Sequence, residues 1–141
     1  MLAAIATTGT AGDGPFLPRL LYHAWRRTGG RIRCVVADTG YDSEANHRLA
    51  RRGLGVRSII PARACRPGGL PPIEPLRRNM HYRFRRAADK QAYGQRWQCE
   101  TAHSMIKRNL GSAMRARTAV HRRHELLLRV ITHNIMLLAE G

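Results

Sequence analysis

The apolar and polar positions of the first half of the chain predict alternating strands and helices. Residues 2–7 form a short apolar run typical of a strand. Residues 15–28 carry apolar side chains at three- and four-residue spacing and end at two glycines, which predicts a helix. Residues 31–37 become continuously apolar, as in a strand covered on both faces. A helix over 43–52, with a serine as its N-cap, and a strand over 56–61 follow, so we expect a parallel pair.

The second half of the chain predicts a basic loop followed by two long helices. Residues 62–84 are rich in proline and arginine, so we expect a loop and not a core element. A helical pattern runs from Asp89, an acidic residue of the kind favoured near a helix start, to position 110 before a glycine. The last helix, over 118–139, is apolar nearly all round, which predicts burial in the core; a partner interface is the alternative.

Composition indicates one basic domain that binds nucleic acid. The 141 residues include 25 lysines and arginines against 9 aspartates and glutamates, a formal charge of +16, and 43% are apolar, enough for a single core. Nearly all the cations are arginines, whose planar fork suits phosphate oxygens. Cys34, Cys65 and Cys99 are widely spaced and predict neither a disulfide framework nor a zinc ribbon. No signal peptide or membrane span is expected, which favours a cytoplasmic location.

Four polar side chains share one sector of the helix predicted over 89–110. At about 100° per residue, Tyr93, Arg96 and Lys107 fall close to Glu100. This face therefore holds a carboxylate, a phenol and two cations. Periodicity alone favours a solvated face on which Arg96 and Glu100 pair four residues apart.

Asp38 follows the strand predicted over 31–37, in the sequence ADTGYD, where Gly40 lets the backbone turn away. Carboxylates that bind ligands favour the ends of strands in α/β sheets. An aspartate shortly before a glycine is more often part of a structural turn. By itself Asp38 therefore indicates a turn. A ligand-binding role for Asp38 is supported only when it is considered together with the residues around Glu100.

Together these two segments resemble the DDE transposases of bacterial insertion sequences, and the resemblance extends over nearly the whole chain. The C-terminal signature of that family is a tyrosine, an arginine three residues later, a glutamate four further on and a lysine seven after that. The sequence YGQRWQCETAHSMIK matches this signature without a gap. The family's middle motif is an aspartate after a hydrophobic strand, followed by a glycine and an aromatic residue. It resembles VVADTGYDSEAN, which places the second catalytic aspartate at Asp38.

The resemblance implies a partial RNase H-like α/β fold, with a truncated mixed sheet flanked by helices and ending in two long helices. It implies that two aspartates and one glutamate hold two divalent metals, Mg²⁺ or Mn²⁺, for DNA cleavage and strand transfer; oxygen ligands suit these cations. Asp38 and Glu100 are the expected catalytic residues and metal ligands. The expected partners are transposon ends and target DNA, in the nucleoid. The expected DNA-binding residues are Tyr93, Arg96 and Lys107.

The family's first aspartate has no counterpart here, because Asp13 is the only carboxylate before Asp38 and lies in a glycine-rich loop. We therefore expect residues 1–141 to be the C-terminal part of a transposase catalytic domain, from a truncated or frameshifted copy. Such a chain should have little activity alone and should self-associate or need an N-terminal portion. Central strands would also be missing, so the strand that ends at Asp38 should expose a hydrophobic edge.

A non-catalytic basic protein that binds DNA or RNA is the competing interpretation. In that case the arginines of residues 62–84 contact phosphates, while Asp38 and Glu100 are incidental. Geometry separates the two interpretations, since the enzyme needs both carboxylates to converge on one side of the sheet.

Overall fold

The computed structural model describes residues 1–5, 12–63 and 70–139, and the chain divides into two compact units. The first unit is residues 12–96, and the second joins residues 1–11 to residues 97–141. The described part is mostly helical and contains one short parallel sheet, so it belongs to the α/β class. In this part of the chain no helix is both long enough and apolar enough to cross a membrane.

The first unit opens with a 3₁₀ turn, η1 (Gly14–Phe16), that leads into helix α1 (Leu17–Arg27). A proline in the first turn of α1 suits a helix start, because its missing N–H would have no intrahelical partner there. Leu21, 4% exposed, anchors the apolar side of the helix. Gly29 and Gly30 follow with φ of 58° and 74°, a conformation that favours glycine after a helix. The helix predicted over 15–28 is confirmed.

Strands β1 (Cys34–Val36) and β2 (Arg57–Ile59) pair in parallel. Val35 lies opposite Ser58 in this register, and the Ala37 amide donates to the Ile59 carbonyl at 3.2 Å just beyond the pair. The two predicted strands and their parallel pairing are therefore confirmed in their central residues. The wider mixed sheet that the resemblance implies is not seen, because the sheet of the described residues has two strands.

The two strands differ in how deeply they lie. Ser58 and Ile59 of β2 are fully buried, whereas Cys34 is exposed and its two neighbours in β1 are half-buried. The expectation that β1 is covered on both faces is therefore wrong. Within the described residues no other strand pairs with the second edge of β1.

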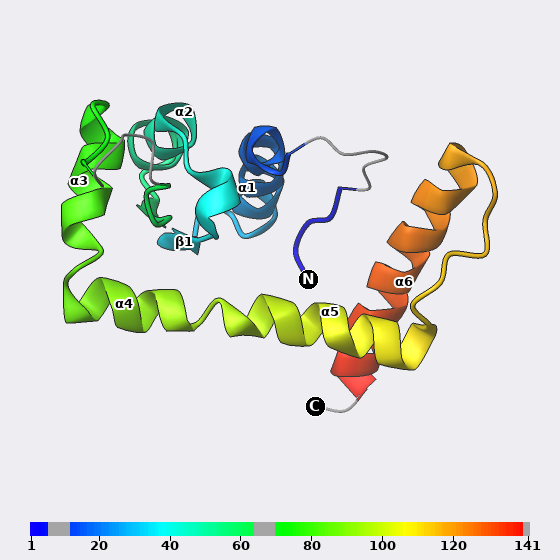
Figure 1. Ribbon diagram of the computed structural model, residues 1–141. Coiled ribbons are helices and arrows are strands. Elements are labelled where there is room, and N and C mark those ends of the chain that lie inside the picture. Colours follow the sequence, from blue (N-terminus) through cyan, green and yellow to red (C-terminus); the bar gives the residue numbers. More distant parts are fainter. Residues whose placement is uncertain (6–11, 64–69, 140–141) are drawn as a thin grey trace. The chain divides into compact units, whose positions relative to one another are not determined.

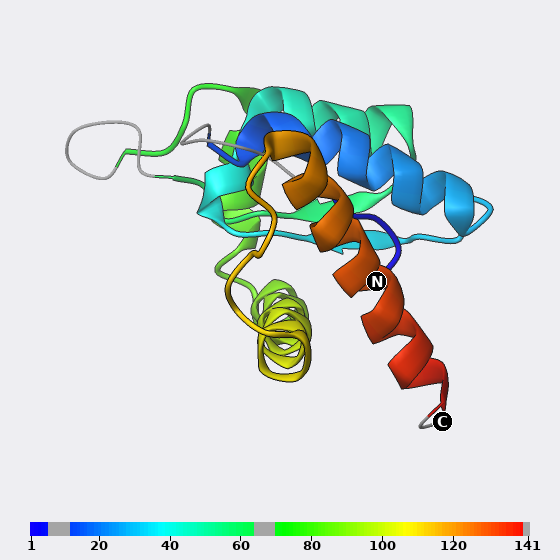
Figure 2. The ribbon, with the colours of Figure 1, turned by 90° about the vertical axis from the view of Figure 1, so that its right-hand side faces the viewer.

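Residues 38–53 connect the strands through three short helical segments. These are a 3₁₀ turn, η2 (Thr39–Tyr41), helix α2 (Glu44–Arg48) and a π-helical turn, η3 (Leu49–Gly53). The Asn46 amide donates to the Ser43 hydroxyl at 3.1 Å, which confirms the predicted serine cap. Helices α1 and α2 lie on the same side of the strand pair (Figures 1 and 2).

Part of the predicted basic loop over 62–84 is a helix, which corrects that expectation. Helix α3 (Pro75–Arg83) begins with a proline at its first position and buries Met80, which is 1% exposed. Leu76, Met80 and Phe84 recur every four residues, so one face of α3 is apolar in spite of the surrounding arginines. Residues 64–69 of the predicted loop lie outside the described residues.

The single helix predicted over 89–110 is two helices, α4 (Ala87–Gly94) and α5 (Trp97–Leu110). Between them the Gln95 and Arg96 amides donate to carbonyls three residues earlier, at 3.2 and 3.0 Å, so the helix tightens and ends. The four polar residues predicted on one helix face are therefore not on one continuous helix.

The second unit contains α5 and α6 (Ala119–Ala139), and α6 matches the prediction over 118–139. The carboxylate of Glu125 accepts the amides of Arg115 and Ala116 at 2.8–3.1 Å and pairs with Arg129 at 2.6 Å, so it holds the α5–α6 loop against α6. Residues 2–5 form no strand, contrary to the prediction for residues 2–7, of which 6 and 7 lie outside the described residues.

The burial predicted for the last helix is wrong for much of its surface. Several apolar residues of α6 are 53–83% exposed, whereas His133 is 3% exposed. The apolar residues are spread around the whole helix, so a single neighbouring helix covers only part of them. The residues that are 53–83% exposed are Val120, Leu128, Ile131, Ile135 and Leu138.

Candidate functional site

Asp38 lies at the end of β1 and forms the N-cap of η2. Its Oδ1 accepts the Gly40 amide at 2.9 Å, and its carbonyl accepts the Tyr41 amide at 3.1 Å. A Cβ added at Gly40 would lie 3.0 Å from the same Oδ1, so a larger residue there would require the Asp38 carboxylate to shift. The side chain is half-buried and directs its carboxylate at the turn that follows the strand.

The turn that carries Asp38 is held at its far side by Asn46. The Asn46 Nδ2 group donates to the Tyr41 carbonyl at 2.8 Å and to the Gly14 carbonyl at 3.0 Å. Asn46 is 4% exposed, so these hydrogen bonds are protected from water. They fasten η2 to η1, at the start of α1.

Asp42 fixes the next position of the same loop. Its Oδ2 accepts Nε and Nη2 of Arg77 at 3.0 and 2.7 Å and the Arg63 amide at 2.9 Å. Burial works to raise the pKa of Asp42, but the contacts with His47, Arg77 and Arg63 outweigh it and lower the pKa to about 2. The carboxylate is therefore charged at neutral pH and joins this loop to α3.

A buried chain of polar groups continues from Asp42 into β2. Nε2 of His47 lies 3.5 Å from Asp42 Oδ1, and His47 Nδ1 lies 2.8 Å from the Ser58 hydroxyl. Arg51 Nε donates to the same hydroxyl at 2.8 Å, so Ser58 links His47 of α2 to Arg51 of η3.

This chain has the residue types of a nucleophilic triad but not the access that a triad needs. Ser58 and His47 are 0% exposed, and so is the Asp42 side chain. A nucleophile must reach its substrate, so these residues stabilise the loop instead of catalysing hydrolysis.

Two further carboxylates position α3 and α4. Glu44 accepts the amides of Leu76 and Arg77 at 3.1 and 3.2 Å and so caps the N-terminus of α3. Asp89, 2% exposed, pairs with Arg57 of β2 and lies 3.5 Å from Arg83 Nε. Burial works to raise the pKa of Asp89, but the two arginines hold that pKa below its ordinary value.

Tyr93 and Arg96 lie together at the end of the first unit. The Tyr93 ring meets Phe84 edge to face, with centroids 5.1 Å apart. The guanidinium carbon of Arg96 lies 5.8 Å from the Tyr93 ring centre, within range of a cation–π contact. Two of the predicted DNA-binding residues are thus neighbours, held by the end of α3.

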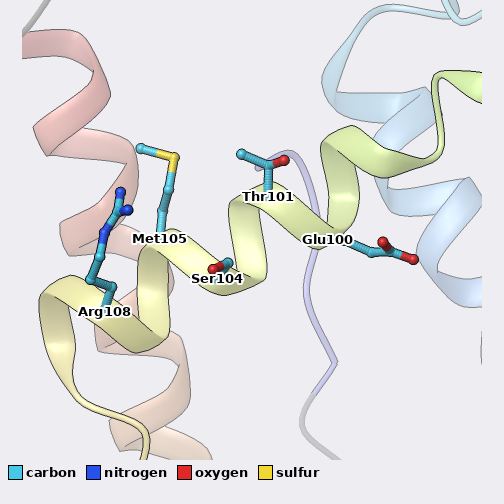
Figure 3. Close-up of a pocket in the computed structure, with 5 residues that line it drawn as sticks. All are labelled: Glu100, Thr101, Ser104, Met105 and Arg108. Atoms are coloured by element: carbon cyan, nitrogen blue, oxygen red, sulfur yellow. The ribbon is translucent and has the colours of Figure 1, made fainter.

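Glu100 and Lys107 are carried by α5 in the second unit. Both side chains are exposed, and they lie two helical turns apart on the same helix. Glu100 lines an open depression of about 290 Å³ on α5, with Arg108 at its other end (Figure 3). The remaining lining residues are Thr101, Ser104 and Met105.

Asp38 and Glu100 belong to different units, so their predicted convergence stays a prediction. Each brings a hard oxygen donor of the kind that Mg²⁺ prefers, and Oδ2 of Asp38 accepts no hydrogen bond from the described residues, so it fits a cation ligand. Among the described residues, no group of three histidines, cysteines or carboxylates is arranged to hold a metal ion.

Sequence reasoning missed the residues that hold the site in place. Asp42 and Glu44 lie close to Asp38 in the sequence, but their partners Arg77 and Leu76 lie more than thirty positions later, and Asn46 bonds to Gly14, 32 positions earlier. The density of polar residues in DTGYDSEAN was the available signal, because a strand-to-helix loop with so many carboxylates and amides needs partners for them.

Comparison with known proteins places the chain in a family. The family model described as a transposase DDE domain matches residues 1–135. Searches of the curated proteins and of the solved structures found no match.

Proposed function

Because the chain belongs to the transposase DDE domain family, we propose that it forms part of the catalytic centre of an insertion-sequence transposase, which cleaves DNA at transposon ends and transfers the strand. The proposal includes an RNase H-like fold, action in the cytoplasm on nucleoid DNA, and assembly with another copy or a further segment. The observation that carries it is Asp38, at the end of β1, in a turn fastened on both sides.

In this proposal Asp38 and Glu100 hold the divalent metals, Mg²⁺ or Mn²⁺. Bound metals of this kind supply Lewis acidity, which favours a deprotonated water or 3′-hydroxyl and neutralises charge on the leaving oxygen. The fastened turn keeps the Asp38 carboxylate in one orientation, which spares the entropy of ordering it when the metal binds.

The predicted DNA-binding residues have distinct roles in this proposal. Arg96 presents a fork to phosphate oxygens, and Lys107 presents a point charge. Tyr93 orients Arg96 through the contact between ring and guanidinium and positions the DNA strand through its hydroxyl.

The third carboxylate is supplied from outside these 141 residues in this proposal. The family uses two aspartates and a glutamate, and this chain matches the second aspartate and the glutamate. A site with two of its three carboxylates binds metal more weakly, so the 141 residues alone are proposed to be nearly inactive.

Metal binding by single and double variants tests the proposal. Mn²⁺ binding to the chain is measured by calorimetry for the wild type, Asp38→Asn, Glu100→Gln and the double variant. If both carboxylates serve one site, each single variant lowers the affinity at least about tenfold and the double variant adds little, since coupled residues are not additive. Asp13→Asn is the matched control and should bind like the wild type.

Two results contradict the proposal. Additive losses would place the two carboxylates at separate sites, and an unchanged affinity in the double variant would make both incidental. Either result favours the alternative, a non-catalytic protein that binds nucleic acid through its arginines.

A further inference from the structure

We propose that one face of α1 binds the phosphate backbone of duplex DNA and guides it to the turn that carries Asp38. Five residues at helical spacing form this surface, which we call the basic face of α1. All five side chains are exposed, and their positions correspond to i, i+3, i+4, i+7 and i+8. They are Arg19, Tyr22, His23, Arg26 and Arg27.

Acidic side chains are missing from the helix that carries the basic face. Helix α1 contains no carboxylate, and Arg19 and Arg26 pair with no acidic residue among the described positions. His23, Arg26 and Arg27 line a depression of about 290 Å³, which gives an anion room to approach. The opposite side of the helix is buried through Leu21, so the face is held outward by the core.

Several arginines elsewhere in this unit pair with carboxylates. Arg77 pairs with Asp42 and Glu74, and both Arg57 and Arg83 pair with Asp89. Two of these arginines, Arg77 and Arg83, lie in the segment 62–84, to which the competing interpretation assigned the phosphate contacts. The charge of these two is neutralised inside the protein, whereas α1 gathers several exposed cations on one face and contains no carboxylate.

The position of α1 connects this face to the proposed catalytic centre. Its first turn follows η1, which is joined to the Asp38 turn because Asn46 bonds to both. From Arg19 to Arg27 the helix rises ~12 Å, which matches roughly three to four phosphates of one strand at ~3.4 Å per base pair. The guiding role therefore rests on the proposed function, whereas the DNA contact itself does not.

Duplex DNA fits this surface better than a single strand. Proteins that bind single strands present open aromatic rings on which bases stack. The face has one aromatic ring of this kind, Tyr22, and Arg26 lies 6.0 Å from its centre while His23 meets it at an edge. The face therefore offers a row of cations, and its one aromatic ring is already in contact with Arg26 and His23. Such a surface suits the regularly spaced phosphates of a duplex.

The test compares two double variants with the same loss of charge. Arg19→Ala, Arg26→Ala removes the face, whereas Arg48→Ala, Arg52→Ala removes two exposed arginines from α2 and η3. Binding of a labelled 30-base-pair duplex of arbitrary sequence is followed by fluorescence anisotropy in EDTA, so that no metal contributes. Circular dichroism confirms that both variants fold.

We expect the α1 variant to lower affinity about tenfold and to reduce the slope of log affinity against log salt by about 1.8, or ~0.9 for each lost phosphate contact. The control should change affinity less than about threefold, and Arg19→Lys, Arg26→Lys should restore most of the binding. Equal losses in both double variants would mean that only net charge matters, and no loss in the α1 variant would mean a solvated face; either overturns the proposal. Tighter binding to an RNA duplex of the same sequence would overturn the choice of partner.

Failure of this proposal and failure of the proposed function have different signatures. If Asp38→Asn leaves Mn²⁺ affinity unchanged while the loss of Arg19 and Arg26 weakens DNA binding, the proposed catalytic centre is wrong and the proposed α1 surface is supported. The α1 variant should bind Mn²⁺ as the wild type does. If Asp38→Asn weakens Mn²⁺ binding while the α1 variant binds DNA like the wild type, the catalytic centre is supported and the α1 surface is wrong.

Discussion

At the scale of single residues, the loop after β1 depends on a buried carboxylate. Asp42 holds Arg77 and the Arg63 amide, and its side chain is 0% exposed. The pKa of Asp42 in the folded protein is about 2, below the ordinary value of 3.8, so the folded state favours the charged form. The resulting stabilisation is present above about pH 4 and is lost as the pH falls towards 2, and it amounts to ~2 kcal/mol.

Replacing Asp42 should remove this acid sensitivity. We expect Asp42→Asn to lower the free energy of unfolding by about 3 kcal/mol at pH 7, because Arg77 keeps its charge and loses its buried partner. Between pH 4 and pH 2 the variant should lose about 2 kcal/mol less than the wild type. Urea unfolding followed by circular dichroism at pH 7, 4, 3 and 2 measures both. If the free energy of unfolding of the variant and of the wild type changed with pH in the same way, this role for Asp42 would be contradicted.

At the scale of elements, the local sequence pattern predicted those segments whose packing depends on residues close together in the chain. The strand–helix–strand order around Asp38 followed from apolar runs, a serine cap and glycines, all within a few positions of each other. Helix α3 was missed because prolines and arginines masked the four-residue spacing of Leu76 and Met80. Its N-terminus is capped by Glu44, a long-range partner that no local pattern reveals.

A core role for α3 predicts a large effect at Met80. Met80→Ala should lower the free energy of unfolding by about 2–4 kcal/mol, because a 1% exposed side chain leaves a cavity. Ile73→Ala is the matched control: Ile73 is 70% exposed just before α3, and its loss should cost about 0.5 kcal/mol or less. Thermal or urea unfolding measures the stability change of both variants. Similar small effects would restore the original expectation of a basic loop.

The break between α4 and α5 shows what periodicity leaves undetermined. The spacing of Tyr93, Arg96, Glu100 and Lys107 fits one helix face, yet the backbone bonds of Gln95 and Arg96 end the helix between them. Gly94 weakens the helix there, since glycine costs about 1 kcal/mol relative to alanine. The motif identified the residues of the candidate site, whereas their placement depends on tertiary structure.

At the scale of the whole molecule, the family signature and the charge were readable from the sequence, but the distribution of that charge was not. The net charge of +16 indicated a nucleic-acid partner. Which arginines are neutralised by Asp42 and Asp89, and which remain on α1, depends on contacts between elements distant in the chain.

Catalysis by the assembled protein gives the prediction at this scale. The 141 residues alone should not nick DNA that carries the ends of the element in Mg²⁺. Nicking should appear when a polypeptide with the family's upstream strands and first aspartate is added, because the third carboxylate completes the set of ligands. The same polypeptide with that aspartate changed to asparagine is the control. Nicking by the 141 residues alone would contradict the requirement for a third carboxylate.

The contacts that fasten the Asp38 turn also set an order of events during synthesis. The partner of Asp42 in α3 lies 35 positions later, and the amides capped by Glu44 lie 32 and 33 positions later. While the ribosome is still making the intervening residues, these carboxylates have no partners and the turn lacks its clamp. The nascent chain can therefore hold the turn through Asn46 before α3 is made, but it gains the contacts from α3 only after that helix has emerged, well after Asp38 itself.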